Sequence, residues 1–446
     1  MASAIIQADK YILLRLPSTN TKLLVLKDHS TVNLGKFGVF HADDIIGKPY
    51  GHTYEICADK KLKIVRKHQL TYSVDEVNNN QATIDDTARQ TLTMDDIEAL
   101  KTGDLQGRQI IDTVIQGHMA YDEKTEFSKH KYVKRKEEKF LRTFTPLKPT
   151  SWNIAQHFFE KDMAKILELK VETLSFILTA ANIRPGGKYL VVDDAAGLIT
   201  TAILERLGGS GTVLSLHDNE HPNFDIIKYL DFREDTLTRL LYNLDFLEAF
   251  YPNERSSLEA TGDPATMKSR QREAYYRKQR AYTRLSECRH IYDEQNFDAL
   301  IIATSFDPIC LLSRLTPQVS GSRVIVVYSP HKETLIHTSH WMQAQHTILA
   351  PTVSEIRARK FQAILGRIHP EMMATSGGGY VLTGIRVLPV DSVVAKGKVD
   401  FKGKALRKSK ATKDLNGEKR KIEMNEYVGG EPDSKKLKVD TTADQI

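Results

Sequence analysis

The sequence of 446 residues is poor in cysteine, with only Cys57, Cys288 and Cys310, which lie far apart. Because no CxxC pair or closely spaced set is present, we expect a reducing compartment and predict neither a disulfide framework nor a metal site. No apolar run reaches the roughly 18 residues that a membrane-spanning helix requires. The N-terminus lacks a basic leader followed by a long apolar core, and we expect no secretory signal.

What is present is the composition of a soluble globular protein. Apolar residues make up 41% and charged residues 27% of the chain, which are ordinary values. The length leaves room for two or more domains, each with its own hydrophobic core. The formal net charge is +6, and its uneven distribution along the chain is more informative than its size.

The central feature is the segment 187–201, which has the pattern of a strand, a tight turn and a helix. Tyr189 to Val192 is a short apolar β run, Asp193 to Gly197 is the turn, and apolar residues from Ile199 to Leu207 recur at helical spacing. This pattern predicts the first unit of a Rossmann-like sheet, in which a nucleotide-type cofactor would lie across the turn.

That turn is short of glycine. A cofactor-binding turn needs glycines at alternate positions so that bare backbone can approach the ligand. Here Ala195 and Ile199 occupy two of those positions, and only Gly197 is kept. The next predicted strand, 212–216, is followed by His217 where an acid would normally bind the ribose hydroxyls. We therefore predict a degenerate site and assign no cofactor-binding residue; an unusual but working site is the alternative.

Strands and helices alternate over residues 151–390. A helical stretch runs from Ser151 to about Asn182, and residues 235–292 also read as helices, without a convincing third strand. The other expected strands are 189–192, 212–216, 298–303, 323–328 and 380–387, with helices at 199–207 and 224–232. This alternation predicts a mostly parallel sheet that is covered on both faces.

Residues 1–120 are predicted to form a β-rich domain with a helical end. Strand-like runs between Tyr11 and Arg66 are separated by turn residues every few positions, as in the hairpin signal of 17–21. A helical pattern follows at Thr93–Leu100. The predicted fold class is therefore α/β, with a small β-barrel-like domain in front of the Rossmann-like domain.

Residues 121–150 are predicted as a basic linker. Between positions 124 and 142 there are eight basic and three acidic residues, interleaved with Tyr132, Phe140 and Phe144. Aromatic rings can stack on bases while lysine and arginine neutralise phosphates, which makes this block a candidate RNA-binding surface. A solvated helix face is the alternative. The candidate contacts are Lys129, Lys131, Lys134, Arg135, Lys136, Lys139 and Arg142.

Two further segments are basic. The predicted helix around 270–284 carries arginines and tyrosines, and here a solvated face is favoured over an RNA contact. The tail, 391–446, contains Lys396–Lys421 with eleven basic and three acidic residues, and it has too few apolar residues to fold. The run Lys435-Lys436-Leu437-Lys438 is typical of a nuclear import signal or an RNA-tethering arm.

Several blocks in a fixed order carry a resemblance to a known family. They are 187–201, 211–221, 298–308 and 377–387, together with the motifs at 131–139, 182–187, 366–370 and 378–380. From the N-terminal strands to about residue 390, the chain resembles the eukaryotic tRNA (adenine-N1)-methyltransferase complex, and specifically its non-catalytic subunit.

The resemblance implies a methyltransferase-like fold that has lost its chemistry. The family's catalytic subunit carries an aspartate at the end of the fourth strand, and that position falls on Ala303 here. Asp307 is four residues further on and is an unlikely substitute. The chain is therefore expected to have no catalytic residue and to bind no cofactor itself. S-adenosylmethionine is expected in the partner subunit.

The same resemblance implies tRNA binding and a T-loop adenine as the target. In the segment 366–370, Arg367 and His369 suggest a loop that contacts RNA, with a structural turn as the alternative, and Arg367 is included among the candidate RNA contacts. The resemblance also implies a hetero-oligomer with the catalytic subunit, with two copies of each. A nuclear location is expected from the basic run at 435–438. Two alternatives stay open at this point. One is an active methyltransferase with a divergent site, and the other is an RNA-binding factor of the translation-initiation type.

Overall fold

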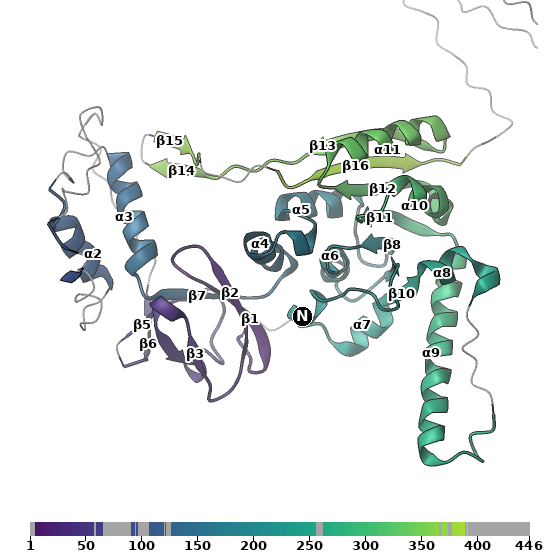
Figure 1. Cartoon of the computed structure of the whole chain (residues 1–446), viewed down its shortest axis with the longest axis horizontal. Coiled ribbons are helices and arrows are strands. Elements are labelled where there is room, and N and C mark those ends of the chain that lie inside the picture. Colours follow the sequence, from purple (N-terminus) through teal and green to yellow (C-terminus); the bar gives the residue numbers. More distant parts are fainter. Residues whose placement is uncertain are drawn as a thin grey trace, which may run out of the picture. The chain divides into compact units, whose positions relative to one another are not determined.

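The computed structural model in Figure 1 describes the chain from residue 5 to residue 390 with gaps. The described residues are 5–57, 59–65, 91–93, 95–96, 107–119, 121, 126–255, 262–364, 367–372, 377–388 and 390. Two compact units are separated at residues 389 and 390, and all but Val390 of the second lies outside the described residues. The predicted basic tail therefore lies outside them too, as does most of the predicted helix at Thr93–Leu100.

The N-terminal region is an antiparallel β structure, as the sequence predicts. Its five-stranded sheet has the order β2-β1-β7-β5-β6, and β3 pairs with β4 in a separate hairpin. The strands are β1 Lys10–Arg15, β2 Thr21–Leu26, β3 Thr31–Asn33, β4 Val39–His41, β5 Thr53–Ile56, β6 Leu62–Val65 and β7 Thr143–Leu147. Alternate residues of these strands, such as Ile12, Leu14 and Tyr54, are buried in one core with Phe40 and Phe144.

Strand β7 lies in the segment that the sequence analysis describes as a basic linker. It pairs with β1 on one side and with β5 on the other, so it is a central strand of the N-terminal sheet. The chain thus leaves this sheet after β6 and returns to it at Thr143. Local sequence patterns cannot predict that the chain returns to this sheet, because β7 and β5 are more than eighty residues apart in sequence.

Two of the described α-helices lie directly before β7 in the chain. These are α2 Gly107–Gln116 and α3 Glu126–Phe140, and they pack together through a small core of Ile110, Ile111, Val114 and Phe140. The predicted basic block is thus a helix held by its apolar side, and its charged side faces solvent.

The Rossmann-like region contains a seven-stranded sheet of order β10-β9-β8-β11-β12-β16-β13. Strands β10, β9, β8, β11 and β12 are mutually parallel. Strand β16 pairs antiparallel with β12, and β13 pairs antiparallel with β16, so only β16 runs against the other strands of the sheet. The strands are β8 Lys188–Asp193, β9 Thr212–His217, β10 Leu241–Asp245, β11 Phe297–Ala303, β12 Val319–Ser329, β13 Ile348–Glu355 and β16 Tyr380–Arg386. This confirms the predicted α/β class, with a mixed edge that the sequence analysis did not include.

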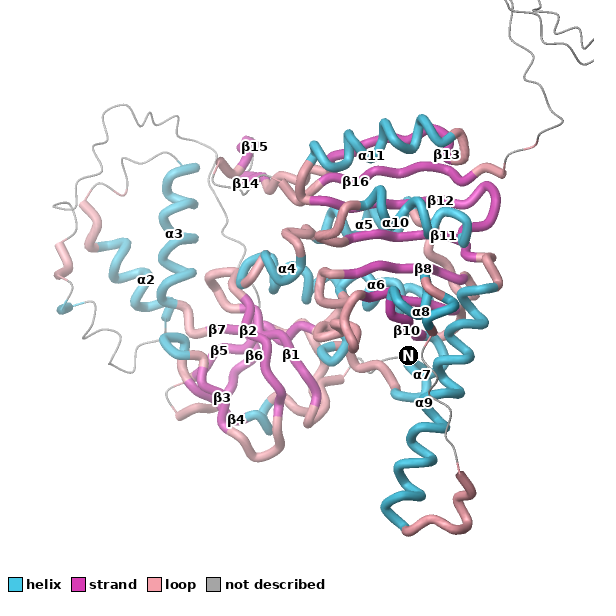
Figure 2. The backbone as a smooth tube through the Cα atoms, turned by 45° about the vertical axis from the view of Figure 1, so that its right-hand side comes forward, coloured by secondary structure: helices cyan, strands magenta, loops and turns pink. Residues whose placement is uncertain are grey.

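Helices cover both faces of this sheet (Figures 1 and 2). One apolar cluster contains residues of α4 Ser151–Lys161, α5 Val171–Ala180, α6 Leu198–Leu207 and α7 Glu234–Leu240. The cluster on the other face contains residues of α8 Phe246–Phe250, α9 Ser269–Asp293, α10 Pro308–Leu315 and α11 Lys332–Gln345. None of the helices that the structure describes combines the length and apolar composition of a membrane span.

Short 3-10 helices and one hairpin complete the described elements. The 3-10 helices are η1 Gly35–Phe37, η2 Ala42–Asp44, η5 Ala164–Ile166, η6 Ile227–Tyr229, η7 Pro252–Glu254 and η8 Thr316–Gln318, and the hairpin is β14 Phe361–Ile364 with β15 Arg367–Pro370.

Two sequence predictions in this region are wrong. The third strand that seemed missing is β10, which pairs in parallel with β9 at the edge of the sheet. It has only one fully buried apolar residue, Leu244, and therefore lacks the continuous apolar run of a central strand. The helix expected at 224–232 is only the short η6, and the longer helix α7 follows it.

Candidate functional site

The turn after β8 is held together by a buried carboxylate. Asp193 ends the strand, and its carboxylate accepts hydrogen bonds from the Ala195 N–H at 3.0 Å, the Thr200 N–H at 2.8 Å and the Thr200 hydroxyl at 2.9 Å. Burial raises the pKa of Asp193 to about 6, and the hydrogen bonds from Thr200 oppose that rise. These bonds join the end of β8 to the turn and to the first residues of α6, so this acid stabilises the strand–turn–helix unit itself.

Another segment of the same chain packs against Gly197, the one glycine kept in the turn. Gly197 has φ of +78°, and a Cβ atom there would lie 3.0 Å from the Phe224 Cα and 3.2 Å from the Asn223 carbonyl oxygen. The Ile226 N–H donates to the Ala196 carbonyl at 3.1 Å. The segment after β9 therefore lies directly on the turn, where a cofactor would approach the backbone.

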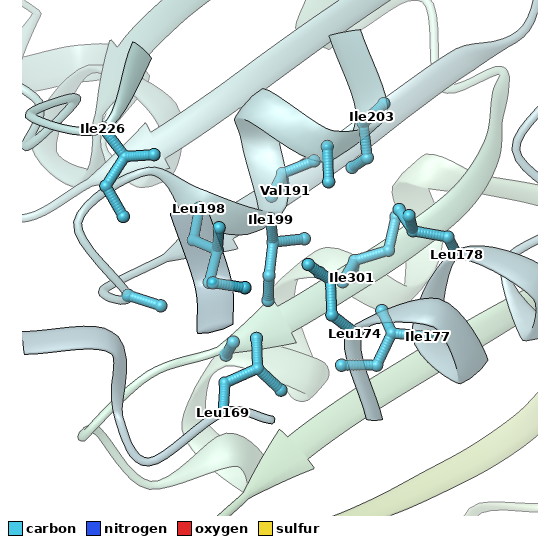
Figure 3. Close-up of a cluster of buried hydrophobic side chains, with 14 of the residues drawn as sticks. Leu169, Leu174, Ile177, Leu178, Val191, Leu198, Ile199, Ile203, Ile226 and Ile301 are labelled. Carbon is cyan, nitrogen blue, oxygen red and sulfur yellow. The ribbon is translucent and has the colours of Figure 1, made fainter. Parts of the chain in front are cut away.

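A side chain fills the place of a missing glycine. Ile199 is fully buried within the apolar cluster on this face of the sheet. Figure 3 shows it in the middle of that cluster, with Leu198 to one side and Ile301 to the other. Ala195 is also fully buried. The two positions that the sequence marks as lost glycines are thus part of the hydrophobic core.

The other two positions that the sequence marks as lost are His217, which is half-buried, and Ala303. At the end of β9, the His217 Nδ1 contacts the Asn219 carbonyl oxygen at 2.6 Å, and its Nε2 is buried without a hydrogen-bond partner among the described residues. Burial lowers the pKa of His217, so the ring is neutral near pH 7. At the end of β11, Ala303 is fully buried.

The acids close to Ala303 are engaged in structural contacts. The Asp194 carboxylate accepts hydrogen bonds from the Thr304 hydroxyl at 2.5 Å and the Ser305 N–H at 3.1 Å. Asp307 caps α10 by accepting a hydrogen bond from the Ile309 N–H at 3.1 Å. Over the part of the chain that the structure describes, no group of acids, histidines and cysteines could hold a metal ion.

The basic helix α3, in contrast to the turn, has charged side chains that are exposed to solvent. Lys131, Arg135 and Lys139 are exposed and follow one another at a spacing of four residues, which places them on one side of the helix. No ion pair within the described residues involves any of the three side chains, and the Lys139 ammonium lies 5.5 Å from the centre of the Phe140 ring. This side of α3 is therefore a row of cations in contact with solvent.

The other candidate contacts of α3 are partly engaged. The Lys136 ammonium lies 4.9 Å from the centre of the Tyr132 ring, and burial lowers its pKa. Lys129 lies over the Tyr121 ring at 5.9 Å. Lys134 is exposed but forms an ion pair of 3.6 Å with Glu371. Arg142 follows the helix and is half-buried.

The predicted base-stacking role of the aromatic residues is wrong. Phe140 and Phe144 are 5% and 1% exposed, because they belong to the cores of the helix pair and of the N-terminal sheet. Tyr132 packs against the rings of His118 and Tyr121. The aromatic residues between the basic ones of α3 therefore lie on the packed side of the helix. Hydrophobic periodicity in the sequence can indicate such a side.

The structure brings the hairpin of Arg367 to the same helix. The Gln362 amide nitrogen of β14 lies 2.5 Å from the His130 Nδ1 of α3, and Glu371 just after β15 pairs with Lys134. Arg367 begins β15, and its side chain lies outside the described residues. The sequence could not show this neighbourhood, since the contacting residues are more than 230 positions apart.

A groove of about 810 Å³ runs beside α3, against the N-terminal sheet. The groove is lined by Lys134 and by three basic residues that the sequence analysis missed, which are Arg15, Lys63 and Arg108. Glu55, Glu137 and Glu138 line it as well, so its charge is mixed. No local signal marks these three basic residues, because they come from separate elements.

The fold and the filled turn define a class: a Rossmann-like protein of the methyltransferase type whose cofactor-binding turn is occupied by its own core. The model of the Gcd10p family matches residues 5–274, and the chain belongs to this family. A relative from Debaryomyces hansenii is 37% identical, over 90% of this chain and 91% of its own length. Relatives from Eremothecium gossypii and Schizosaccharomyces pombe are 34% and 32% identical, each over 88% of this chain and 94% of their own length.

All three relatives are named as the non-catalytic subunit, TRM6, of tRNA (adenine(58)-N(1))-methyltransferase. Among solved structures, the tRNA (m1A58) methyltransferase TrmI from Aquifex aeolicus gives a TM-score of 0.45 at 13% identity, covering 86% of this chain and all of that one. A TM-score this low does not support a fold assignment by itself, so the assignment rests on the strand order described above.

Proposed function

We propose that this chain is the non-catalytic, tRNA-binding subunit of a tRNA (adenine-N1)-methyltransferase. The observation that carries the proposal is the filled turn: Ile199 and the segment at 223–226 occupy the space in which a cofactor-binding relative of this fold would need bare backbone. The names of the relatives support the same function. S-adenosylmethionine would then be held by the catalytic partner, which modifies a T-loop adenine.

Calorimetric titration with S-adenosylmethionine tests the proposal directly. The isolated chain should show no binding and no tRNA methylation, whereas the complex with its catalytic partner should show both. Binding by the isolated chain at micromolar concentration would instead favour an active methyltransferase with a divergent site. Failure to co-purify with any methyltransferase-like chain would favour an RNA-binding factor unrelated to methylation.

An apolar surface on the mixed edge of the sheet is suited to the catalytic partner. Leu349 of β13 and Ile385 of β16 are cross-strand neighbours that are 54% and 44% exposed. Their neighbours in sequence, Ile348 and Gly384, face Met342 of α11. Because side chains alternate along a strand, Leu349 and Ile385 point to the opposite face, which leaves them uncovered.

Further exposed apolar residues lie close to this patch along the chain. Leu388 follows β16 and is 60% exposed, and β13 is the last strand of the sheet, so one side of its backbone is open to pairing. Exposed apolar patches of this kind mark protein interfaces. We assign this one to the catalytic subunit, and propose an assembly with two copies of each chain.

The assembly is tested by co-expression with the catalytic partner and a mass measurement of the purified complex. Leu349→Asp with Ile385→Asp should abolish co-purification, because two charges would be buried in an apolar contact. Met163→Asp, at another exposed apolar side chain, serves as the control and should leave assembly intact. A complex of normal mass with the double variant would refute the interface.

The RNA-binding part of the proposal is supported by the solvent-facing row Lys131, Arg135 and Lys139. Three cations spaced along one side of a helix can each neutralise a phosphate, and such contacts dominate RNA affinity. The mixed charge of the neighbouring groove is less suited to a polyanion than the outer side of α3 is.

We also propose that the complex works in the nucleus. The support is the basic run Lys435-Lys436-Leu437-Lys438 in the tail. A fluorescent fusion with these three lysines replaced by alanine should lose its nuclear accumulation. Unchanged accumulation would show that this run is not the signal.

A further inference from the structure

Among the described residues, the contacts that anchor the long helix α9 to the sheet come from its C-terminal half. There Cys288 and Tyr292 are buried, and Arg289 forms a salt bridge with the buried Glu248. The Arg284 guanidinium donates to the backbone carbonyl oxygens of Thr238 and Leu241, both at 2.7 Å. These contacts fix α9 firmly beside β10, the edge strand of the sheet.

The N-terminal half of α9 packs against almost nothing that the structure describes. Every residue from Ser269 to Thr283 is exposed except Tyr275 and Tyr282, which are half-buried. At 1.5 Å per residue this half is about 22 Å long. Figures 1 and 2 both show it extending away from the sheet.

This projecting half is strongly basic. Five basic residues and a single acidic one, Glu273, lie between Ser269 and Thr283. No salt bridge among the described residues involves this half. Two of the five are used locally. Arg272 donates to the carbonyl oxygens of Pro264 at 3.0 Å and Met267 at 3.2 Å, and Arg280 donates to the carbonyl oxygen of Tyr276 at 3.3 Å. Three side chains remain without a hydrogen-bond or ion-pair partner within the described residues: Arg270, Arg277 and Lys278.

Such a helix is costly to maintain unless something binds to it. A helix of about 15 residues without tertiary contacts is only marginally stable in water, and its like charges repel one another. A polyanion placed against Arg270 and Arg277, which lie two turns apart on one side of the helix, would remove that repulsion. An acidic protein is a poorer fit, because a protein interface also needs a desolvated apolar centre.

We propose that residues 269–283 of α9 form a second RNA-binding element, which contacts the phosphate backbone through Arg270, Arg277 and Lys278. This inference rests on the proposed function, since it requires the complex to act on RNA. It differs from the α3 surface in its location: α9 extends from the β10 edge of the Rossmann-like sheet, whereas α3 packs on α2. The substrate would thus be held by two separate basic helices.

The test uses the assembled complex with its catalytic partner and an unmodified full-length tRNA transcript. Replacing Arg270, Arg277 and Lys278 by alanine should raise the dissociation constant about tenfold. It should also flatten the log–log salt dependence by roughly two to three units, because three phosphate contacts are lost. Alanine is the best helix former, so the helix itself should persist. Circular dichroism checks that it does.

A charge-retaining variant gives the matched control. Arg270→Lys with Arg277→Lys and Lys278→Arg keeps every positive charge and should bind tRNA with an affinity and salt dependence close to those of the parent. If this variant lost affinity as fully as the alanine variant did, the effect would not be one of phosphate neutralisation, and the proposal would be overturned.

A parallel variant of α3, with Lys131, Arg135 and Lys139 replaced by alanine, separates this inference from the proposed function. If the α3 variant weakens tRNA binding and the α9 alanine variant does not, the inference about α9 is wrong and the proposed function stands. If neither variant weakens tRNA binding, both RNA surfaces are wrong. If the α9 alanine variant lowers affinity and the charge-retaining variant does not, the second element is established.

Discussion

The turn after β8 and the helix α3 use their polar and charged side chains in opposite ways. At the turn, the Asp193 carboxylate accepts three hydrogen bonds, one from Ala195 and two from Thr200 at the start of α6, and Ile199 is buried in the core. On α3, the side chains of Lys131 and Arg135 face solvent. Hydrogen bonds that are formed within the protein, as at the turn after β8, stabilise the fold. Charges without a partner in the protein, as on α3, are available to bind a ligand.

This contrast separates two kinds of effect that substitutions should have. Changes in the turn should lower the free energy of unfolding without a direct effect on RNA affinity at equal amounts of folded protein. Changes on the exposed side of α3 should lower RNA affinity with little effect on unfolding. The following experiments test this distinction, and they are given in order of decreasing expected effect.

The largest effect is expected at Ile199. Ile199→Ala should lower the free energy of unfolding by about 3 kcal/mol, because it removes buried methyl and methylene groups and leaves a cavity. It should not create S-adenosylmethionine binding, since the segment at 223–226 still lies on the turn. Urea unfolding and calorimetric titration measure the two quantities. Cofactor binding by this variant would mean that one side chain alone had closed the site.

A slightly smaller loss is expected at Asp193. Asp193→Ala should lower the free energy of unfolding by about 2–3 kcal/mol, because the N–H of Ala195 and the N–H and hydroxyl of Thr200 would lose their acceptor. Glu220→Ala, at an exposed acid in the loop after β9, is the control and should change little. Equal stability of the two variants would show that the carboxylate does not hold the turn.

The α3 variant with Lys131, Arg135 and Lys139 replaced by alanine should weaken tRNA binding by about tenfold, or about 1.4 kcal/mol, and flatten the salt dependence. Unfolding and subunit assembly should be unchanged, because these side chains are exposed. Replacing Glu138 by glutamine should act in the opposite direction by removing a negative charge between them. Fluorescence anisotropy at several salt concentrations measures both variants. An unaltered affinity for the triple variant would show that this side of α3 is only solvated.

The smallest effect concerns pH and His157, which joins α4 to the N-terminal sheet. Its Nδ1 lies 2.6 Å from the Thr21 hydroxyl, and burial together with Lys161 lowers its pKa below the ordinary 6.5. The unfolded chain therefore binds the proton more readily, so this residue's contribution to stability is complete above pH 6.5 and falls as the pH drops below it.

His157→Gln should remove this part of the pH dependence. Urea unfolding of the parent and the variant at pH 8 and at pH 5.5 gives the comparison. The difference in unfolding free energy between the two pH values should be smaller in the variant. An identical pH dependence in both proteins would show that His157 does not titrate with folding.

The positions of most strands could be predicted from the sequence because their pattern is local. The apolar run at Tyr189–Val192 and the glycines that end α6 define β8 and its helix within twenty residues of chain. Strand β10 could not be predicted in this way. As an edge strand with one buried residue, Leu244, it is recognised only by its pairing with β9.

At the candidate site, the sequence by itself determined which chemical groups are absent. No fold can make Ala303 accept a proton or turn Ile199 into bare backbone, so the absence of an acid and of a glycine at these two positions follows from residue identity alone. The basic character of residues 124–142 is fixed in the same way, since charge is carried by residue type.

Only the tertiary structure decided which of the remaining groups are available. Phe140 and Phe144 looked able to stack on bases until packing placed them in two different cores, and Lys136 lies over Tyr132. Lys131 and Arg135 stay in solvent because α2 covers the opposite side of α3. The physical reason is that burial and pairing depend on contacts between residues distant in sequence, which side-chain chemistry and local periodicity do not specify.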